Sequence, residues 1–456
     1  MSIDIAAAPA ATRIQPETFI PERATRTKEP ARVPRRHRFD FDAAIVGLGY
    51  VGLPTALALH ATGAKVLGVD LSEHRLATIR NGEADLVDSD RLRLASAMAG
   101  SDFEISGDPF LLGDAAAVII CVPTPIDRYS TPDLAILASA CATVVDAAVP
   151  GQLLVLTSTT YAGCTRDMLL VPLQKRGLIA GKDISVAFSP ERIDPGNESF
   201  THEEVPRVVG GATEACRLAA EALLGRYARN VHAVGSLEAA EMTKLLENTF
   251  RAVNIALANE FAEACRVLDL PVLDIINAAA TKPYGFMPFF PGPGVGGHCI
   301  PCDPHYLLWQ LRREHIALPI IEQAMAEIGS RPRQVVERIR EILADHSTPM
   351  KGSRVLVVGV SYKPDVADLR ESPALEILSL LHDRGVDVAF YDPFFDSVTL
   401  HDGTELPATL DPTGFGANLV LLHTDHTLVD TSWLSTEQIV LDATYRRIDL
   451  PHRFLL

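Results

Sequence analysis

Long apolar runs and basic side chains are both scarce in this 456-residue chain. No apolar run approaches the roughly 20 residues that span a bilayer, so we expect the chain not to cross a membrane. Lys and Arg number 41 against 58 Asp and Glu, which gives a net charge of −17. Because binding to nucleic-acid phosphates needs clustered basic residues, this deficit argues against DNA or RNA as a partner.

Cysteine is sparse as well, with seven residues, an odd number, scattered through the chain. The beginning of the chain lacks the apolar core of a signal peptide. We therefore expect reduced thiols in a cytoplasmic protein. What remains is ordinary for a globular protein, with 47% hydrophobic and 22% charged residues. The length indicates two to four domains with ample core.

The first 40 residues differ in character from the remainder. They contain eight basic and five acidic residues and almost no periodic apolar pattern. Five prolines interrupt the segment: Pro9, Pro16, Pro21, Pro30 and Pro34. A segment of this composition cannot bury enough apolar surface to fold, so we expect residues 1–40 to form a disordered tail.

From Asp42 onward, short apolar runs alternate with amphipathic stretches, which is typical of strand–helix–strand units and a parallel sheet. The expected strands of a first block are residues 43–46, 65–69, 117–121, 153–157 and 184–188. Those of a second block are residues 354–358, 387–391, 418–422 and 438–441. The sequence predicts an α/β protein with two Rossmann-like, doubly wound parallel-sheet domains, residues 41–235 and 336–456.

A long helical pattern lies between the two blocks and begins after Gly235, with Ser236 as the expected N-cap. Apolar side chains recur at spacings of three and four: Met242, Leu246, Phe250, Val253, Leu257, Phe261, Ala264 and Leu268. This spacing predicts one buried stripe along the helix. We expect the helix to join the sheet domains within a central helical domain, residues 236–335. We also expect it to supply the interface of a homodimer or larger homo-oligomer.

A dinucleotide site is predicted directly after the first strand, where the sequence is Gly47-Leu48-Gly49-Tyr50-Val51-Gly52. In GxGxxG the first glycine allows the tight turn, the second lets a pyrophosphate approach the backbone, and the third permits close helix–strand packing. Asp70 ends the next strand, where a carboxylate accepts hydrogen bonds from ribose hydroxyls and repels a 2′-phosphate. These features favour NAD over NADP, against the alternative of a glycine-rich structural turn.

Two further loops follow expected strands of the first block. One contains Val122, Pro123 and Thr124, and the other contains Ser158 and Thr159. Open α/β sheets bind ligands beyond the carboxyl ends of their strands, so both loops would border the nicotinamide end. For either loop alone, a structural turn is nearly as good an explanation.

The most informative stretch is residues 290–299, in which four glycines within six residues precede Cys299. Glycines strip side chains from a loop where the backbone lies against a ligand. A cysteine there is a candidate nucleophile if its neighbours stabilise the thiolate. It could instead be a small buried residue, or a metal ligand with His298, Cys302 and His305. No second ligand pair exists elsewhere in the chain, so we expect no metal.

Polar residues on the long helix and at a strand end are expected to border one ligand-binding crevice, beyond the carboxyl ends of the strands. Lys244, Asn248 and Arg251 occupy positions i, i+4 and i+7, offset from the apolar stripe. A solvated face is the usual explanation, but Asn is a poor mid-helix residue and suggests a polar partner. Glu191 and Arg192 follow the strand at residues 184–188, which places a carboxylate beside this crevice.

Together these motifs resemble the UDP-glucose/GDP-mannose dehydrogenase family, over essentially residues 41–450. The segments that carry the resemblance are GLGYVGLP, CVPTP, STTY, SPERIDPGN, TKLLENTFRAVNIALANE, GPGVGGHCIPCDPHYL and SYKPDVADLRESP. The resemblance implies oxidation of a sugar C6 alcohol to a carboxylate with two NAD⁺, without release of the aldehyde. It also implies that the C-terminal domain binds the UDP part. One departure is Cys302, where the family usually has an aliphatic residue.

The resemblance further implies roles for individual residues. Cys299 attacks the aldehyde to form a thiohemiacetal, which a second hydride transfer converts to a thioester that water hydrolyses. Lys244 stabilises oxyanions at C6, and Asn248 positions the sugar or a water. Asp303 and Glu191 are candidates for proton handling and water activation, and Thr159 for orienting that water.

Ligand contacts also follow from the resemblance. Arg370 matches an arginine that reaches the NAD site from across the cleft, and Lys363 matches a lysine that contacts the substrate. The expected substrate-binding residues are Glu191, Arg192, Lys244, Asn248, Arg251, Gly294, Gly297 and Lys363.

The sequence favours a UDP-N-acetylglucosamine 6-dehydrogenase that supplies uronic acids for surface polysaccharide. The stretch from Ala280 to Pro301, with SPERIDPGN, looks most like that branch of the family. The same chemistry on UDP-glucose or UDP-N-acetylmannosamine is the nearest alternative. A two-electron hydroxyacid dehydrogenase would share GxGxxG but would not need Cys299. From another class, an inactive nucleotide-sugar-binding regulator would have lost part of the set Glu191, Lys244, Asn248, Cys299 and Asp303.

Overall fold

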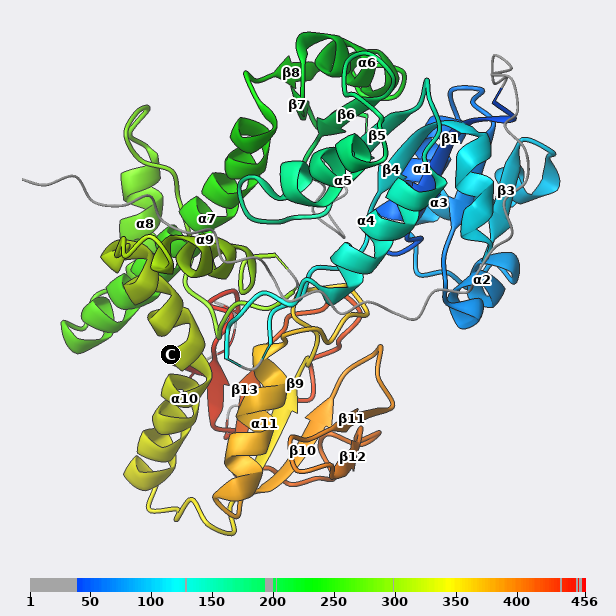
Figure 1. Ribbon diagram of the computed structural model, residues 1–456. Coiled ribbons are helices and arrows are strands. Elements are labelled where there is room, and N and C mark those ends of the chain that lie inside the picture. Colours follow the sequence, from blue (N-terminus) through cyan, green and yellow to red (C-terminus); the bar gives the residue numbers. More distant parts are fainter. Residues whose placement is uncertain are drawn as a thin grey trace, which may run out of the picture. The chain divides into compact units, whose positions relative to one another are not determined.

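The structure, a computed structural model, describes residues 39–127, 129–192, 200–201, 203–297, 299–434, 437–447, 450 and 453–456 (Figure 1). The predicted tail lies outside these residues except for its last two positions. His298 and residues 193–197 of the SPERIDPGN segment lie outside them too.

The first block is an eight-stranded sheet with the strand order β3-β2-β1-β4-β5-β6-β7-β8. Neighbouring strands are parallel except for β6 and β7, which run antiparallel. All five expected strands are present within two residues of their expected ends, and β3, β7 and β8 are additional. The strands are β1 Phe41–Val46, β2 Val66–Val69, β3 Phe103–Ser106, β4 Ala115–Ile120, β5 Leu153–Leu156, β6 Ser185–Phe188, β7 Arg207–Gly211 and β8 Val231–Ala233.

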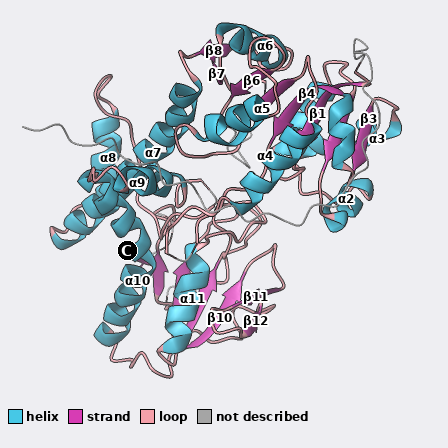
Figure 2. Ribbon diagram, in the orientation of Figure 1, coloured by secondary structure: helices cyan, strands magenta, loops and turns pink. Residues whose placement is uncertain are grey.

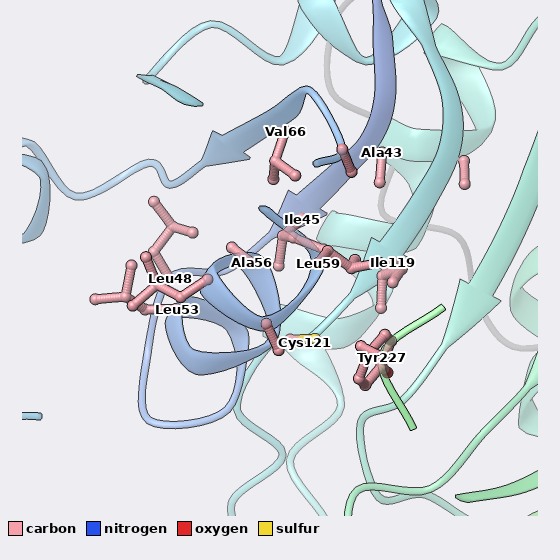
Figure 3. Packing of buried hydrophobic residues seen from close by; sticks show 14 of the residues in the cluster. Ala43, Ile45, Leu48, Leu53, Ala56, Leu59, Val66, Ile119, Cys121 and Tyr227 are labelled. Carbon is pink, nitrogen blue, oxygen red and sulfur yellow. The ribbon is translucent and has the colours of Figure 1, made fainter. Parts of the chain in front are cut away.

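Helices cover both faces of this sheet, which confirms the doubly wound prediction (Figure 2). Successive residues of β1 point to opposite faces, Ile45 into one buried cluster and Ala44 into the other. Figure 3 shows side chains of the first cluster, among them Ile45, Ile119 and, from the first helix, Leu53. The helices of this block are α1 Gly52–His60, α2 Glu73–Arg80, α3 Asp88–Ala99, η1 Pro109–Asp114, α4 Ala135–Ala147, η2 Arg166–Leu170, α5 Val171–Lys175 and α6 Glu214–Leu224.

The second block is a five-stranded sheet in the order β10-β9-β13-β14-β15, parallel throughout, beside a two-stranded antiparallel hairpin. Its four expected strands are all present, which confirms the second α/β block. The strands are β9 Arg354–Val358, β10 Asp387–Tyr391, β13 Leu419–Leu422, β14 Val440–Asp442 and β15 Arg453–Leu455, with the hairpin β11 Ser397–Thr399 and β12 Glu405–Pro407. Helix α11, Pro373–Asp383, contributes Ile377, Leu378 and Leu381 to the core of this block.

Four helices separate the two sheets along the chain: α7 Leu237–Val267, α8 Val272–Ala280, α9 Asp303–Arg312 and α10 Pro319–Asp345. As predicted, Ser236 caps α7, where its hydroxyl accepts a hydrogen bond from Ala239 N. Among the residues that the structure describes, no helix has the length and apolar character to cross a membrane. Residues from Phe39 onward group as one compact unit, so the expected boundaries between domains stay predictions.

The predicted buried stripe of α7 is wrong for the single chain. Leu246, Phe250, Leu257 and Phe261 are 66%, 46%, 48% and 53% exposed. The buried side of the helix carries small residues and polar ones instead: Ala240, Glu241, Lys244, Asn248, Ala252, Ala256, Asn259 and Ala262. Small side chains let the neighbouring elements approach closely, which leaves the large apolar side chains on the outer surface of the helix.

Candidate functional site

The glycines after β1 fit the roles predicted for a dinucleotide site. Gly47 has a φ of +88°, and a Cβ there would lie 2.7 Å from the Cys121 carbonyl oxygen. A Cβ on Gly52 would lie 1.8 Å from the Gly47 carbonyl oxygen. A Cβ on Gly49 would meet nothing within 4 Å. The turn and the helix packing therefore require two of the glycines, while open space beside the third leaves room for a pyrophosphate.

Asp70 is held beside this loop by backbone amides. Its carboxylate accepts hydrogen bonds from Leu48 N at 2.8 Å and from Ser72 N at 2.9 Å. Arg75, which the sequence reading missed, donates from Nε to the Leu48 carbonyl oxygen at 2.7 Å. The carboxylate thus lies at the carboxyl end of β2, where a ribose would be bound.

We expect Asp70→Ala to weaken NAD⁺ binding about tenfold, because a charged hydrogen-bond partner is lost. Discrimination against NADP⁺ should shrink at the same time, since the repulsive charge also disappears. The comparison is Kd for both cofactors by fluorescence titration, with Asp70→Asn as the matched variant that keeps an acceptor for Leu48 N. Unchanged preference in both variants would contradict this assignment.

Arg370 reaches the glycine loop from the second block, as the resemblance implied. Its guanidinium carbon lies 4.4 Å from the centroid of the Tyr50 ring, a cation–π distance. An ion pair with Asp368 at 2.6 Å fixes the guanidinium, and Tyr50 donates from its hydroxyl to Asp85 at 2.9 Å. Burial raises the pKa of Tyr50, so its hydroxyl stays protonated. Val51 adjoins this ring at the start of α1.

The loops after β4 and β5 are tied to each other. Ser158 Oγ accepts from Val122 N at 2.9 Å and donates to the Val122 carbonyl oxygen at 2.8 Å. Tyr306 of α9 donates to the Thr124 carbonyl oxygen at 3.1 Å. The loops that contain Pro123 and Thr159 are therefore joined, and their predicted position beside the nicotinamide stays a prediction. The sequence did not predict the supporting tyrosine.

The expected catalytic residues of α7 and α9 come together in a buried polar cluster. Lys244 and Asn248, one turn apart on α7, are 7% and 4% exposed, and Asp303 at the start of α9 is 2% exposed. Asn248 donates a hydrogen bond from Nδ2 to the Asp303 carboxylate. Asp303 N in turn donates to the Cys299 carbonyl oxygen at 2.8 Å. The solvated-face explanation is wrong for Lys244 and Asn248, because these two side chains face the protein, whereas Arg251 of the same stripe is exposed.

Burial keeps both the thiol and the carboxyl of this cluster from ionising easily. Burial, with the nearby Asp303 charge, raises the pKa of Cys299 to about 11, although Lys244, Arg251 and Arg370 act in the opposite direction. Burial likewise raises the pKa of Asp303 to about 6, against Lys244 and Asn248. At neutral pH the unliganded protein therefore pairs a protonated thiol with an ionised carboxylate, which is a proton acceptor.

Glu191 is bound by an arginine that the sequence reading missed. Both carboxylate oxygens of Glu191 accept from Arg207 Nη1, at 2.7 and 2.8 Å, and Arg207 is 2% exposed. Lys244 Nζ donates to the Glu191 backbone oxygen at 2.7 Å. Arg207 starts β7, a strand that the pattern did not predict, so no signal in the sequence linked it to Glu191.

The glycines before Cys299 pack against the second block, and Gly294 also lines a cavity of about 560 Å³. Their predicted contact with a ligand stays a prediction. A Cβ on Gly294, Gly296 or Gly297 would lie 2.6 Å from Pro373, 2.5 Å from Tyr362 or 3.0 Å from Tyr362. Gly297 N also donates to the Arg370 carbonyl oxygen at 2.9 Å. These positions need glycine because protein from the second block lies directly against the loop.

The other expected substrate-binding residues differ in how far they are buried. Arg192 forms an ion pair with Glu247 at 2.7 Å, and Arg251 is exposed on α7. Lys363 is half-buried between Tyr362 and Pro364, which both line a cavity of about 560 Å³. The remaining lining residues come from the glycine loop, from α8, from the start of α11 and from the carboxyl ends of β13 and β14, among them His423, Thr424 and Arg446.

The metal alternative for the cysteine loop finds no support among the residues that the structure describes. They hold no group of three or more His, Cys, Asp or Glu side chains arranged to bind a metal ion. His298, one of the four candidate ligands, lies outside these residues. Cys302 is buried and immediately precedes α9, and every cysteine is a free thiol.

Comparison with known families matches most of the chain. The NAD binding domain of the UDP-glucose/GDP-mannose dehydrogenase family matches residues 42–228. The central domain of that family matches residues 238–327, and its UDP binding domain matches residues 356–447.

Individual relatives match over most of their own length. The UDP-N-acetyl-D-mannosamine dehydrogenase of Escherichia coli K12 is 34% identical over 353 residues, 74% of this chain and 82% of the relative. An NDP-N-acetyl-D-galactosaminuronic acid dehydrogenase of Ralstonia solanacearum is 32% identical, over 84% of this chain and 90% of the relative. Among solved structures, a UDP-D-ManNAc dehydrogenase from Pyrococcus horikoshii superposes with a TM-score of 0.82 at 29% identity, covering 91% of this chain and 98% of that one.

Proposed function

Because this chain belongs to the UDP-glucose/GDP-mannose dehydrogenase family, we propose that it oxidises the C6 hydroxyl of a UDP-sugar to a carboxylate, with NAD⁺ as the oxidant. The observation that carries this proposal is the position of Cys299, which joins a glycine loop to a buried cluster of Lys244, Asn248 and Asp303. A two-electron dehydrogenase would not need a thiol at this position.

UDP-N-acetylmannosamine is the proposed substrate. The sequence reading favoured UDP-N-acetylglucosamine and kept UDP-N-acetylmannosamine as an alternative. Relatives named for UDP-N-acetylmannosamine at 34% identity, together with the Pyrococcus structure, favour that alternative. The product would be a uronate precursor of surface polysaccharide, made in the cytoplasm.

The glycine loop and Asp70 fit NAD, which supplies the hydride acceptor when it is bound. Cys299 would add to the sugar aldehyde and hold it covalently, so that no free aldehyde escapes while the cofactor is exchanged. Since the thiol is protonated at neutral pH, addition requires a proton acceptor, and Asp303 is the ionised group beside it. We assign to the Lys244 ammonium the stabilisation of an oxyanion at C6.

Asn248 and Arg207 would hold the two carboxylates of the site in place. Asn248 orients Asp303 through its amide, and Arg207 fixes Glu191 through both carboxylate oxygens. Arg207 already occupies both carboxylate oxygens of Glu191, whereas the pKa of Asp303 is about 6, so Asp303 rather than Glu191 is the better candidate for activating water. Thr159 lies on the neighbouring edge, where it would orient that water.

The function is tested by supplying purified protein with NAD⁺ and a panel of UDP-sugars. We expect kcat/KM for UDP-N-acetylmannosamine to exceed those for UDP-N-acetylglucosamine, UDP-N-acetylgalactosamine and UDP-glucose by about tenfold or more, with two NADH per sugar oxidised. One NADH per sugar would refute the four-electron reaction. Cofactor and UDP binding without any turnover would instead favour the inactive regulator.

The outer side of α7 is the proposed interface of a homodimer. Exposed Leu246, Phe250, Leu257 and Phe261 follow one another at helical spacing along 31 residues of helix. A contiguous apolar surface of this kind is unusual on a monomer and marks a site of association. The proposed domains stay as the sequence predicted them, with a central domain, residues 236–335, that contains this surface.

Placing a charge in this surface should dissociate the dimer. We expect Phe250→Asp to raise the dimer dissociation constant at least about tenfold, as truncation of a central aromatic anchor typically does. Sedimentation or light scattering at micromolar protein measures the change, with Glu260→Ala as a control at an exposed polar position of the same helix. A wild-type protein that is monomeric at these concentrations would overturn the interface.

A further inference from the structure

The turn after β9, residues 359–365, connects the nucleotide cavity to the cysteine loop. Tyr362 and Pro364 of this β9 turn line the 560 Å³ cavity, and Lys363 lies between them. The Tyr362 side chain also packs against Gly296 and Gly297, three and two residues before Cys299. A displacement of the turn would therefore shift both the residues that line the expected nucleotide cavity and the loop that carries the thiol.

Buried side chains from neighbouring strand ends hold the backbone of the β9 turn. Val360 N donates to Asp392 Oδ2 at 2.7 Å, after β10. Thr424 donates from Oγ1 to the Ser361 carbonyl oxygen at 2.6 Å, after β13. Asp365 N donates to His426 Nδ1 at 2.9 Å. Asp365 has a φ of +60°, which non-glycine residues rarely adopt, so the end of the turn depends on such external bonds.

The hydrogen bonds of His426 determine which of its ring nitrogens carries a proton. Its Nδ1 accepts from a backbone amide, so this nitrogen carries no proton. Its Nε2 lies 3.1 Å from Asp392 Oδ2 and 3.0 Å from Ser361 Oγ, where it acts as a donor to the carboxylate. The residue is 2% exposed. The tautomer with its proton on Nε2 satisfies the Asp365 amide and the Asp392 carboxylate at once.

Asp392 is the second buried residue that holds the β9 turn. Burial acts to raise its pKa, but hydrogen bonds from His426, Val360 N and Phe394 N prevail and lower it, so the carboxylate stays ionised. The Phe394 ring meets the His426 ring edge-on, with centroids 5.0 Å apart. His426 therefore joins three segments, the β9 turn and the ends of β10 and β13, through one side chain.

We propose that His426 is a positioning residue of the reaction, which holds the β9 turn so that Lys363 and Tyr362 meet the UDP part of the substrate and the cysteine loop. This inference rests on the proposed function, because it assigns the cavity to UDP. Among the described residues, the hydrogen bonds of His426 go to Ser361, the Asp365 amide and Asp392, so it acts through the β9 turn and not by touching the ligand or the thiol.

The two bonds of His426 are separable by substitution. His426→Asn keeps an acceptor near the position of Nδ1, so it can still accept from Asp365 N. His426→Gln keeps a donor near the position of Nε2, so it can still donate to Asp392. His426→Ala removes both. We expect Kd for UDP, by calorimetry on the full chain, to rise about tenfold in His426→Ala and by a smaller factor in His426→Asn. KM for the UDP-sugar should rise in parallel, with kcat changed less than threefold.

To distinguish positioning of Lys363 from a purely structural role of His426, each His426 substitution is combined with Lys363→Met. If His426 acts through Lys363, the same His426 substitutions should change Kd for UDP less than twofold in the Lys363→Met background. His382→Ala, at a half-exposed position of α11 in the same block, is the matched control and should leave Kd unchanged. Thermal unfolding identifies any variant that fails to fold, in which case His426→Asn carries the comparison.

The outcomes separate this inference from the proposed function. Equal tenfold effects in both backgrounds, an unchanged Kd in folded His426→Ala, or an unchanged Kd in Lys363→Met would each overturn it. A wild-type protein that binds UDP but oxidises no UDP-sugar refutes the proposed function, while the binding measurements still decide the role of His426. A wild type that does not bind UDP refutes both.

Discussion

Replacing Cys299 by serine should reduce the steady-state rate of NADH formation from a UDP-sugar by about 10³-fold or more. An alkoxide is much harder to generate than a thiolate near neutral pH, and an oxygen ester is less activated towards hydrolysis than a thioester. The loss should fall on kcat, because the side chain acts on the reacting carbon and not on the nucleotide. NADH yield per active site, by rapid mixing, measures the effect alongside KM.

Cys302→Ser is the matched control for this result. Cys302 lies three residues further along the same loop, is buried, and immediately precedes α9, where serine is well tolerated. The turnover of the Cys302→Ser variant should stay within about twofold of the wild type, with and without a chelator. Full two-NADH turnover by Cys299→Ser, or loss of wild-type activity on chelation, would refute the covalent mechanism.

Asp303→Asn should lower kcat/KM by about 10²- to 10⁴-fold, the range expected when a general base is removed. In the wild type, burial raises the pKa of Asp303 to about 6, so the carboxylate is the main form above that pH and the neutral acid is the main form below it. Activity that needs the carboxylate should therefore fall as pH decreases through about 6. The variant has no such group and should lose this acidic limb.

The pH profile of kcat/KM between pH 5 and 8, a window chosen around this pKa, distinguishes a base from a structural residue. Asn keeps an acceptor for the Asn248 amide, so thermal unfolding should show a folded variant. Asp274→Asn, at an exposed position of α8, serves as the control and should keep the wild-type profile. An acidic limb with the same midpoint in Asp303→Asn would assign the titration to another group.

Local pattern was sufficient to predict the two sheets and the glycine turn. Apolar runs such as residues 354–358 and 387–391 coincide with β9 and β10, since a strand buried on both faces needs a continuous apolar sequence. Strand β8 escaped prediction because it has only three residues, two of them exposed. Strand β7 runs antiparallel to β6, outside the strand–helix–strand pattern.

Helix α7 shows where periodicity is a poor guide to burial. Its spacing of large apolar residues was recognised correctly, but the side that they mark lies on the surface of the chain. The buried side holds Ala252 and Ala256 with Lys244 and Asn248, which hydropathy alone ranks below Leu and Phe. A rule that assigns the largest apolar side chains to the core cannot distinguish a core from an interface between copies.

Long-range pairs were the other class of residue that the sequence could not supply. Arg207 and Glu191 are 16 residues apart, and His426 is 61 residues from the amide of Asp365 that it accepts from. Such pairs arise from the register of neighbouring strands, not from any local spacing. Cys299, Lys244 and Asn248 stood out from local patterns in the sequence, but their roles, and that of Asp303, came only from the resemblance to a known family.

The packing of Gly296 and Gly297 against Tyr362 has a consequence for biosynthesis. The partners of the cysteine loop, Tyr362 and the Arg370 carbonyl, are translated some 60 to 70 residues after Cys299. Domains fold as they emerge from the ribosome, N-terminal first, so the first sheet is available long before these contacts. A nascent chain would thus carry the thiol while lacking the surface that shapes its loop. Catalytic competence is acquired last, when the final sheet closes over a loop that was synthesised well before it.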